Sequence, residues 1–209
     1  MNNFRNFFFN ALIVKTYNKN LVKNGFTPIG LFWSSKKSQY SRFDTLLFLV
    51  KKMDLKKKIR LADVGCGYGS LLNYLKEKKF NCEYFGYDIN KKLIDYCNEN
   101  YPQNFFKCSF FPSEKVDLSV ISGTYDFTVT EDIYQWEEYI IYNLKKCMEN
   151  SKYGLIFNLQ FSKKSSFIRN NIYYTNIQKM FNRLSDEFNN VTKFYSSKNF
   201  KDIYFTILK

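Results

Sequence analysis

From residue 59 onward the apolar residues fall into short runs that alternate with longer amphipathic stretches. The short runs are bounded by turn residues, as expected for buried strands, whereas the stretches between them repeat their apolar positions every three or four residues, as helices do. The expected strands are 59–64, 83–87, 104–107, 118–121, 155–159, 191–195 and 203–208. The expected helices begin at Ser70, run from Asn90 to about Glu99, and cover about 133–150 and 177–188. This alternation predicts a parallel sheet covered by helices on both faces.

The two ends of the chain depart from this alternation. The last two expected strands are separated by residues 196–202, too few for a helical crossover, so they are expected to form an antiparallel hairpin at the sheet edge. Before residue 59 the pattern is helical, with a turn at 24–30 and a helix expected over about 37–53. We therefore expect residues 1–58 to be a helical extension that covers a pocket of the α/β domain, residues 59–209, within one structural unit.

A glycine turn between the first expected strand and its helix carries the strongest chemical signal. It reads Asp63-x-Gly65-x-Gly67-x-Gly69, which differs from the G-x-G-x-x-G spacing of dinucleotide sites. Glycines at this place let the backbone approach a ligand, and ligands of such sheets bind beyond the carboxyl ends of the strands. Asp63 would repel a pyrophosphate but suits an ammonium group. Asp88, which ends the second strand, can accept from both hydroxyls of a ribose. Together these features predict a nucleoside ligand with a cationic amino-acid tail.

The residues of these two turns resemble a known family. Leu61-Ala62-Asp63-Val64-Gly65-Cys66-Gly67-Tyr68-Gly69 is similar to the first motif of the class I S-adenosylmethionine (SAM) dependent methyltransferases, and Tyr84-Phe85-Gly86-Tyr87-Asp88-Ile89 to their second. The resemblance extends over residues 59–208. It implies a Rossmann-like, doubly wound, mostly parallel sheet of seven strands in the order 3-2-1-4-5-7-6 with the last strand antiparallel, SAM as the cofactor, and methyl transfer as the activity.

The resemblance also assigns cofactor contacts. It places the Gly65–Gly67 backbone and Asp63 near the methionine part of SAM, Asp88 on the ribose and Ile89 on the adenine. Many relatives carry an Asp after the third strand, where this chain has Ser109, so the contact with the adenine amino group is expected to be weaker. The expected cofactor-binding residues are Asp63, Gly65, Cys66, Gly67, Asp88, Ile89, Ser109, Ser122 and Arg42.

Arg42 enters that set for a separate reason. It lies in Gln39-Tyr40-Ser41-Arg42-Phe43, one of several stretches that resemble the N-terminal signature of a bacterial methyltransferase subgroup; others contain Tyr17 and Trp33. A guanidinium can hold a carboxylate through two hydrogen bonds. We expect Arg42 to hold the SAM carboxylate, helped by Gln39 one turn earlier, with a surface ion pair as the alternative.

The composition of the chain excludes several kinds of catalytic and metal site. The chain has no His, which excludes Ser-His-Asp systems and His-ligated zinc, and its five cysteines form no CxxC pair, so reduced thiols, no metal site and a cytoplasmic location are expected. Lys, Asn, Phe, Tyr and Ile make up 105 of the 209 residues, a bias typical of A/T-rich codons. The net charge of +13 is therefore weak support for a nucleic-acid partner, and paired lysines are scattered at expected helix ends. The apolar run 7–14 is too short to span a membrane.

The acceptor side is less defined. The loop 122–132 lacks the Asn/Asp-Pro-Pro-aromatic and Pro-Cys motifs of base-modifying relatives, which argues against DNA base modification. We expect an O or N atom of a small molecule as the acceptor. The alternatives are an RNA methyltransferase and a non-catalytic SAM-binding scaffold. Asp126, Glu131 and Asp132 are candidate bases or helix-capping acids, and no catalytic residue is singled out. The candidate acceptor contacts, with core packing as their alternative, are Tyr125, Trp136, Tyr173 and Tyr174, the last two in a candidate lid at 162–176.

Overall fold

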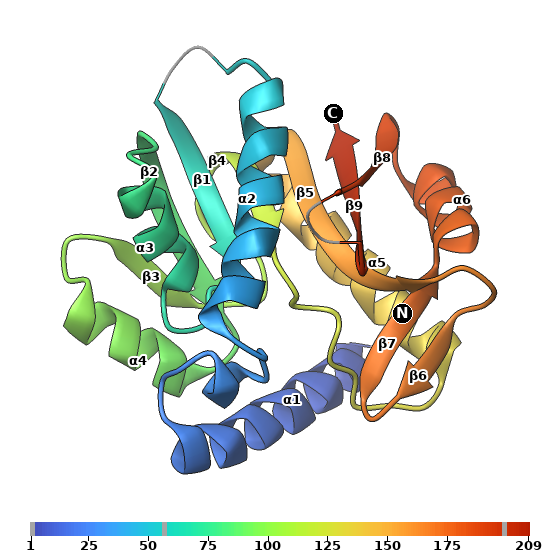
Figure 1. The fold of residues 1–209 in the computed structure, drawn as a ribbon, viewed down its shortest axis with the longest axis horizontal. Coiled ribbons are helices and arrows are strands. Elements are labelled where there is room, and N and C mark those ends of the chain that lie inside the picture. Colours follow the sequence, from blue (N-terminus) through green and yellow to red (C-terminus); the bar gives the residue numbers. More distant parts are fainter. Residues whose placement is uncertain (1–2, 56–57, 198–199) are drawn as a thin grey trace.

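The computed structural model describes residues 3–55, 58–197 and 200–209. Its helices alternate with strands as the pattern of apolar residues predicted (Figure 1). The helices are α1 (Asn3–Asn24), the short 3₁₀ helix η1 (Ile29–Leu31), α2 (Lys36–Lys52), α3 (Ser70–Glu77), α4 (Lys91–Asn100), α5 (Ile133–Asn150) and α6 (Ile177–Glu187). The strands are β1 (Ile59–Val64), β2 (Cys82–Asp88), β3 (Phe105–Cys108), β4 (Val116–Ile121), β5 (Ser151–Ser162), β6 (Phe167–Arg169), β7 (Ile172–Asn176), β8 (Val191–Tyr195) and β9 (Asp202–Leu208).

The main sheet has the expected strand order. Strands β3, β2, β1, β4 and β5 pair in parallel, β9 pairs antiparallel with β5, and β8 pairs antiparallel with β9. Strands β8 and β9 are thus the sixth and seventh strands of the predicted 3-2-1-4-5-7-6 sheet. Because β1 lies between β2 and β4, the strand order reverses at its carboxyl end, where a ligand site is expected.

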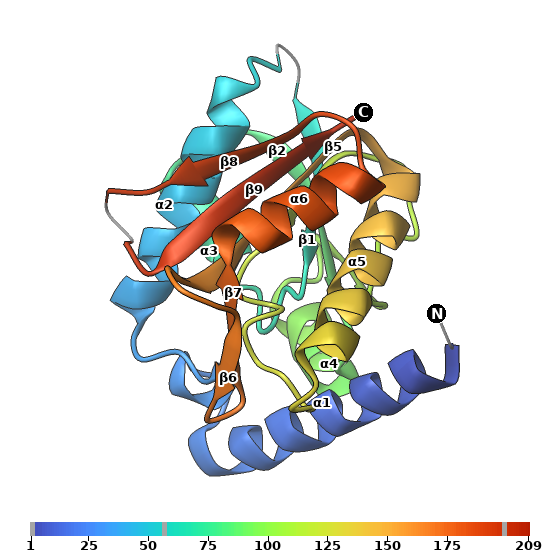
Figure 2. The same ribbon diagram turned by 90° about the vertical axis from the view of Figure 1, so that its right-hand side faces the viewer.

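Helices cover both faces of the sheet and create two apolar cores (Figure 2). Helices α2, α3 and α4 pack on one face around residues such as Leu46 and Leu72. Helices α5 and α6 pack on the other around Ile140 and Leu184. Each core side chain is almost fully buried, as expected for a doubly wound sheet, and the strands between them are correspondingly apolar.

The candidate lid at 162–176 is a β-hairpin that was not predicted. Strand β6 pairs antiparallel with β7, and the turn between them uses Asn170 and Asn171 at φ of 52° and 60°. Two left-handed residues in succession suit a tight hairpin turn, and asparagine tolerates this conformation best after glycine. The hairpin tip is fixed to the loop after β4, since Thr128 N donates to the Asn171 carbonyl at 2.8 Å.

Helix α1 crosses the carboxyl ends of the strands (Figure 1). Its inner face packs on α5, where Phe9 lies against Trp136 at a ring-centroid distance of 6.1 Å. Tyr139 of α5 also donates to Asn10 Oδ1 at 2.5 Å. No helix within the described residues has the length and apolar character needed to cross a membrane.

Candidate functional site

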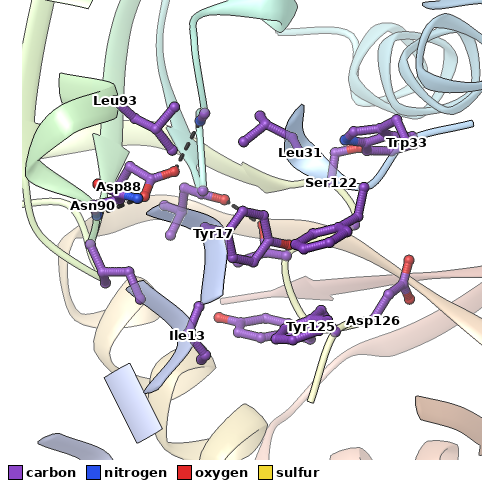
Figure 3. Close-up of a pocket in the computed structure, with 18 of the residues that line it drawn as sticks. Ile13, Tyr17, Leu31, Trp33, Asp88, Asn90, Leu93, Ser122, Tyr125 and Asp126 are labelled. Atoms are coloured by element: carbon purple, nitrogen blue, oxygen red, sulfur yellow. Dashed lines mark hydrogen bonds between the residues drawn. The ribbon is translucent and has the colours of Figure 1, made fainter. Parts of the chain in front are cut away.

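A cavity of about 350 Å³ lies between α1 and the carboxyl ends of β1, β2 and β4 (Figure 3). Its floor is formed by the glycine loop and by the residues that follow β2, β3 and β4. Its cover comes from α1 and from the segment after η1. The hairpin contributes Ile172 at one side. The cavity therefore lies at the predicted switch point of the sheet.

The glycine loop forms part of the cavity wall. Gly65 and Gly67 have φ of 80° and 57°, a left-handed conformation that favours glycine. A Cβ at Gly65 would lie 2.2 Å from Thr124 Oγ1, and one at Gly67 would lie 2.4 Å from Leu31 Cδ1. Both positions thus require glycine, and both line the cavity as expected.

Asp88 is held at the edge of the cavity by backbone amides. Gly67 N donates to its Oδ2 at 3.0 Å, and Asn90 N donates to its Oδ1 at 2.9 Å. Burial raises the pKa of Asp88 to about 6, although these hydrogen bonds act in the opposite direction. Each carboxylate oxygen keeps a further lone pair, so the group can accept from two ligand hydroxyls.

Two of the expected cofactor residues lie behind the cavity wall. Asp63 and Cys66, both expected to bind the cofactor, are buried and do not line the cavity. Asp63 Oδ2 accepts from the Tyr84 hydroxyl at 2.6 Å, and burial raises the pKa of Asp63 to about 7. The Cys66 thiol points toward the Gly67 carbonyl at 3.8 Å. In the loop only the backbone of the glycines faces the cavity.

The remaining strand-end residues do line the cavity. Ile89, Ser109 and Ser122 are all part of its wall. The Ser109 hydroxyl donates to the Phe111 carbonyl at 2.7 Å, so it is engaged in its own turn. Ser122 Oγ is buried and has no hydrogen-bond partner among the described residues.

Arg42 lines the cavity but is already paired with two carboxylates. Its Nη1 donates to Asp126 Oδ2 at 2.7 Å and its Nε to Asp202 Oδ2 at 2.9 Å. The side chain is only 11% exposed and stacks on Trp33, with Cζ 4.6 Å from the ring centroid. Burial disfavours the charge of the guanidinium, yet the two carboxylates outweigh it and raise the pKa of Arg42. The pair is therefore buried, not a surface ion pair. Gln39, which accepts from Ser70 Oγ at 2.8 Å, lies outside the cavity.

Only one of the four candidate acceptor contacts lines the cavity. Tyr125 lines the cavity, whereas the other three side chains pack against neighbouring residues outside it. Trp136 is fully buried and donates Nε1 to the Tyr125 carbonyl at 3.1 Å. Tyr173 is fully buried and donates to Glu137 at 2.6 Å, whereas Tyr174 stacks on Phe167. Each of these three side chains is thus held by the core or by the hairpin, which is the packing alternative kept for them above.

Of the three candidate bases, too, only one lines the cavity. Asp126 is 5% exposed and lines the cavity. Asp132 caps α5 by accepting from Gln135 N at 3.0 Å. Neither Asp132 nor Glu131, which is exposed, lines the cavity. Asp126 is thus the remaining acid on the acceptor side.

The cover of the cavity contains an aromatic group that the pattern of residues did not single out. Tyr17 of α1 lies edge-on to Phe32 and Phe127, at centroid distances of 5.1 and 5.6 Å, and those two rings stack at 5.5 Å. Burial raises the pKa of Tyr17, and the carboxylates of Asp88 and Asp126 add to this effect. The one sequence signal was indirect, because Tyr17 belongs to a stretch that resembles the bacterial subgroup.

The sheet order, the glycine loop after β1 and the carboxylate of Asp88 at the end of β2 together define a class I methyltransferase fold. The family model described as "Methyltransferase domain" matches residues 55–204. The chain therefore belongs to this methyltransferase family, and the resemblance seen in its two turn motifs is confirmed.

Relatives and solved structures agree with this assignment. A protein named as a methyltransferase, from Mycobacterium tuberculosis, is 29% identical over 116 residues, which are 54% of this chain and 70% of that protein. A SAM-dependent methyltransferase of Leishmania major superposes with a TM-score of 0.68 at 12% identity, covering 94% of this chain and 82% of the other. The magnesium protoporphyrin IX methyltransferase of Synechocystis PCC 6803, crystallised with SAM, has a TM-score of 0.56 at 13% identity and covers 79% and 77%. These likenesses show the fold.

Proposed function

We propose that this protein binds SAM and transfers its methyl group to an O or N atom of a small molecule. The observation that carries the proposal is the placement of Asp88. Its carboxylate lines the cavity and is oriented by Gly67 N and Asn90 N, and each of its oxygens keeps a lone pair for a ribose hydroxyl. The glycine loop beside it leaves room for the ligand to approach the backbone.

The residues present fit such a cofactor. A cavity of about 350 Å³ is within the range of small-molecule and cofactor sites. Ile89, Leu93 and Phe110 provide an apolar wall next to Asp88, suited to a purine ring. When bound, SAM supplies an activated methyl group that an acceptor atom displaces in line.

The protein's own contribution is orientation and exclusion of water. Tyr17, Phe32 and Phe127 close one side of the cavity, and Ile172 of the hairpin closes another. Asp126 is the acid best placed to accept a proton from an acceptor atom. Both oxygens of Asp126 already accept hydrogen bonds, from Gln160 N and Arg42 Nη1. Asp126 therefore serves to orient the acceptor molecule more than to remove its proton. An acceptor that is already a good nucleophile suits this arrangement.

The small size of the acceptor is inferred from the enclosure. Helix α1 and the hairpin bound the cavity from two sides, and the described residues show no second domain that would hold a macromolecular acceptor. Known neighbours support small and peptide acceptors: one is named for magnesium protoporphyrin IX and another for N-methylation of a glycopeptide.

Titration calorimetry with SAM and S-adenosylhomocysteine tests the proposal. Asp88→Ala removes two charge-assisted hydrogen bonds to the ribose, so we expect at least about a hundredfold loss of affinity. Asp95→Ala is the matched control, because Asp95 lies on α4 in an exposed pair with Lys91. Absence of binding at millimolar ligand, or an unchanged affinity in Asp88→Ala, would refute the proposal. Labelled SAM incubated with fractionated cell extract then finds the acceptor, and labelling of RNA alone or of nothing would exclude a small-molecule acceptor.

A further inference from the structure

Helix α1 exposes an unusual combination of side chains on its outer face. Taking about 100° per residue, Phe4, Phe8 and Val22 fall within about 40° of one another around the helix axis, with Phe7 beside them. Their exposures are 74%, 51%, 82% and 72%. Ile13 and Tyr17, which line the cavity, lie on the opposite side of the helix. We call the outer surface the α1 outer face; it consists of Phe4, Phe7, Phe8, Ala11, Lys15, Lys19, Val22 and Lys23.

The apolar exposure is concentrated around this face. Of the thirteen large apolar side chains exposed in the described residues, Phe4, Phe7, Phe8 and Val22 lie on this face, and three more lie in the segment that follows α1. Figures 1 and 2 both show α1 along one edge of the molecule, with no described element on its outer side. Exposed apolar groups collected on one surface mark a binding surface, whereas isolated ones do not.

The charge of the same region has a single sign. Residues 1–43 contain five lysines, two arginines and no acidic residue, and so carry seven of the thirteen net positive charges. On α1, Lys15, Lys19 and Lys23 are exposed and form no ion pair with any described residue. A partner that complements this face must therefore present negative charge and accept apolar side chains together.

We propose that the α1 outer face docks on an anionic lipid surface, with its phenylalanines in the interfacial layer and its lysines among the headgroup phosphates. Interfacial helices combine exposed aromatic and aliphatic side chains with lysines in this way. A nucleic acid is less well matched, because Phe4, Phe8 and Val22 lie at the centre of the face beside Lys15, and a phosphate backbone offers no apolar layer to receive them. Docking this way places the cavity cover next to the membrane. The inference does not depend on the proposed methyl transfer.

Vesicle flotation tests this docking. We expect the protein to bind vesicles of phosphatidylcholine mixed with phosphatidylglycerol, to bind pure phosphatidylcholine much less, and to be released by salt. Phe7→Ala with Phe8→Ala should lower the partition coefficient by about tenfold for each ring. Lys15→Glu, Lys19→Glu and Lys23→Glu together should abolish binding.

Two matched controls separate this face from general surface properties. Phe48→Ala with Phe200→Ala removes exposed phenylalanines elsewhere, and Lys152→Glu, Lys163→Glu and Lys164→Glu change the net charge by the same amount as the α1 triple. Both should bind vesicles like the wild type. Circular dichroism and thermal unfolding check that each variant is folded, without reference to any ligand.

Several outcomes would overturn the docking proposal. One is an equal loss of vesicle binding in the control lysine triple, which would mean that net charge alone drives the binding. Another is unchanged vesicle binding in the Phe7→Ala and Phe8→Ala double variant. Binding of a single-stranded RNA instead of vesicles would assign the face to nucleic acid. Self-association that disappears with Phe7→Ala and Phe8→Ala would assign it to a second copy of the chain.

Discussion

The Asp63 carboxyl group is buried at the centre of the sheet. Replacement of Asp63 by Asn should therefore stabilise the protein at neutral and alkaline pH. The side chain is 3% exposed, and its one described hydrogen-bond donor is the Tyr84 hydroxyl at 2.6 Å. Burial raises the pKa of Asp63 to about 7, with a further contribution from Asp88, while the Tyr84 hydrogen bond opposes the shift. An amide has the same shape and still accepts from Tyr84, but carries no charge to bury.

The magnitude follows from the two pKa values of the group. In the unfolded chain an Asp titrates near about 3.9, so folding raises its pKa by about 3 units, or about 4 kcal/mol at 1.36 kcal/mol per unit. Because the folded pKa is the higher one, the protonated group contributes fully below about pH 4 and the contribution is lost as pH rises to about 7. Asp63→Asn should therefore match the wild type near pH 4 and exceed it by about 2–4 kcal/mol at pH 8.

Urea unfolding of the ligand-free protein, followed by tryptophan fluorescence between pH 4 and 8, measures this difference. Asp186→Asn is the control, because Asp186 is exposed, and it should leave the pH dependence unchanged. If Asp63→Asn were less stable than the wild type at pH 8, the ionised carboxylate would be a stabilising group and the reasoning from burial would be wrong. A parallel loss of SAM affinity would instead support the ammonium contact expected from the sequence.

Three further predictions concern the cavity wall. Arg42→Ala leaves two carboxylates buried without their cation and should cost about 3–5 kcal/mol in urea unfolding, less at pH 5 than at pH 8 because Asp202, whose pKa burial raises to about 6, then takes up a proton. Adding Asp202→Asn should recover part of this loss; no recovery would mean that the guanidinium matters by packing alone. Gly123→Ala should cost about 2 kcal/mol and weaken SAM binding, since φ is 68° and a Cβ would lie 2.8 Å from Arg42 Nη1; wild-type values in calorimetry and unfolding would contradict this. Cys108, the one exposed cysteine among the described residues, lies 3.5 Å from the Ile89 carbonyl, so saturating SAM should slow its alkylation severalfold, as followed by mass spectrometry. An unchanged rate would place the adenine elsewhere.

The features that could be predicted from the sequence are those fixed by neighbouring residues. The strands of the main sheet follow from the short apolar runs, the turn after β1 follows from the spacing of its glycines, and Asp88 follows from its place at the end of β2. In a parallel sheet these positions converge on one edge whatever the rest of the chain does. The fold, and the place of Gly65, Gly67 and Asp88 at one edge of the sheet, could therefore be predicted from the sequence.

The acceptor end of the cavity could not be predicted from the sequence, because its contacts join residues that are far apart in the chain. Arg42 meets its two carboxylates across 84 and 160 positions of the chain, and nothing local distinguishes a guanidinium that is paired from one that is free to hold a ligand. Trp136 and Tyr173 are aromatic residues near the site in sequence, yet the packing of α5 and the hairpin turns them into the core. The cover by Tyr17 likewise depends on where α1 lies, which periodicity does not specify.

The net charge is the feature whose interpretation changes most. A drift of codons toward Lys explains an excess of lysines spread over the chain, but it does not explain a local absence of acids. Residues 44–209 contain all 19 acidic residues, and at that density about five would fall within residues 1–43, where there are none. The positive sign of the N-terminal segment thus arises from missing carboxylates, a property of position and not of composition. Because that segment both covers the cavity and exposes its phenylalanines, its charge is best explained by what α1 contacts on its outer side.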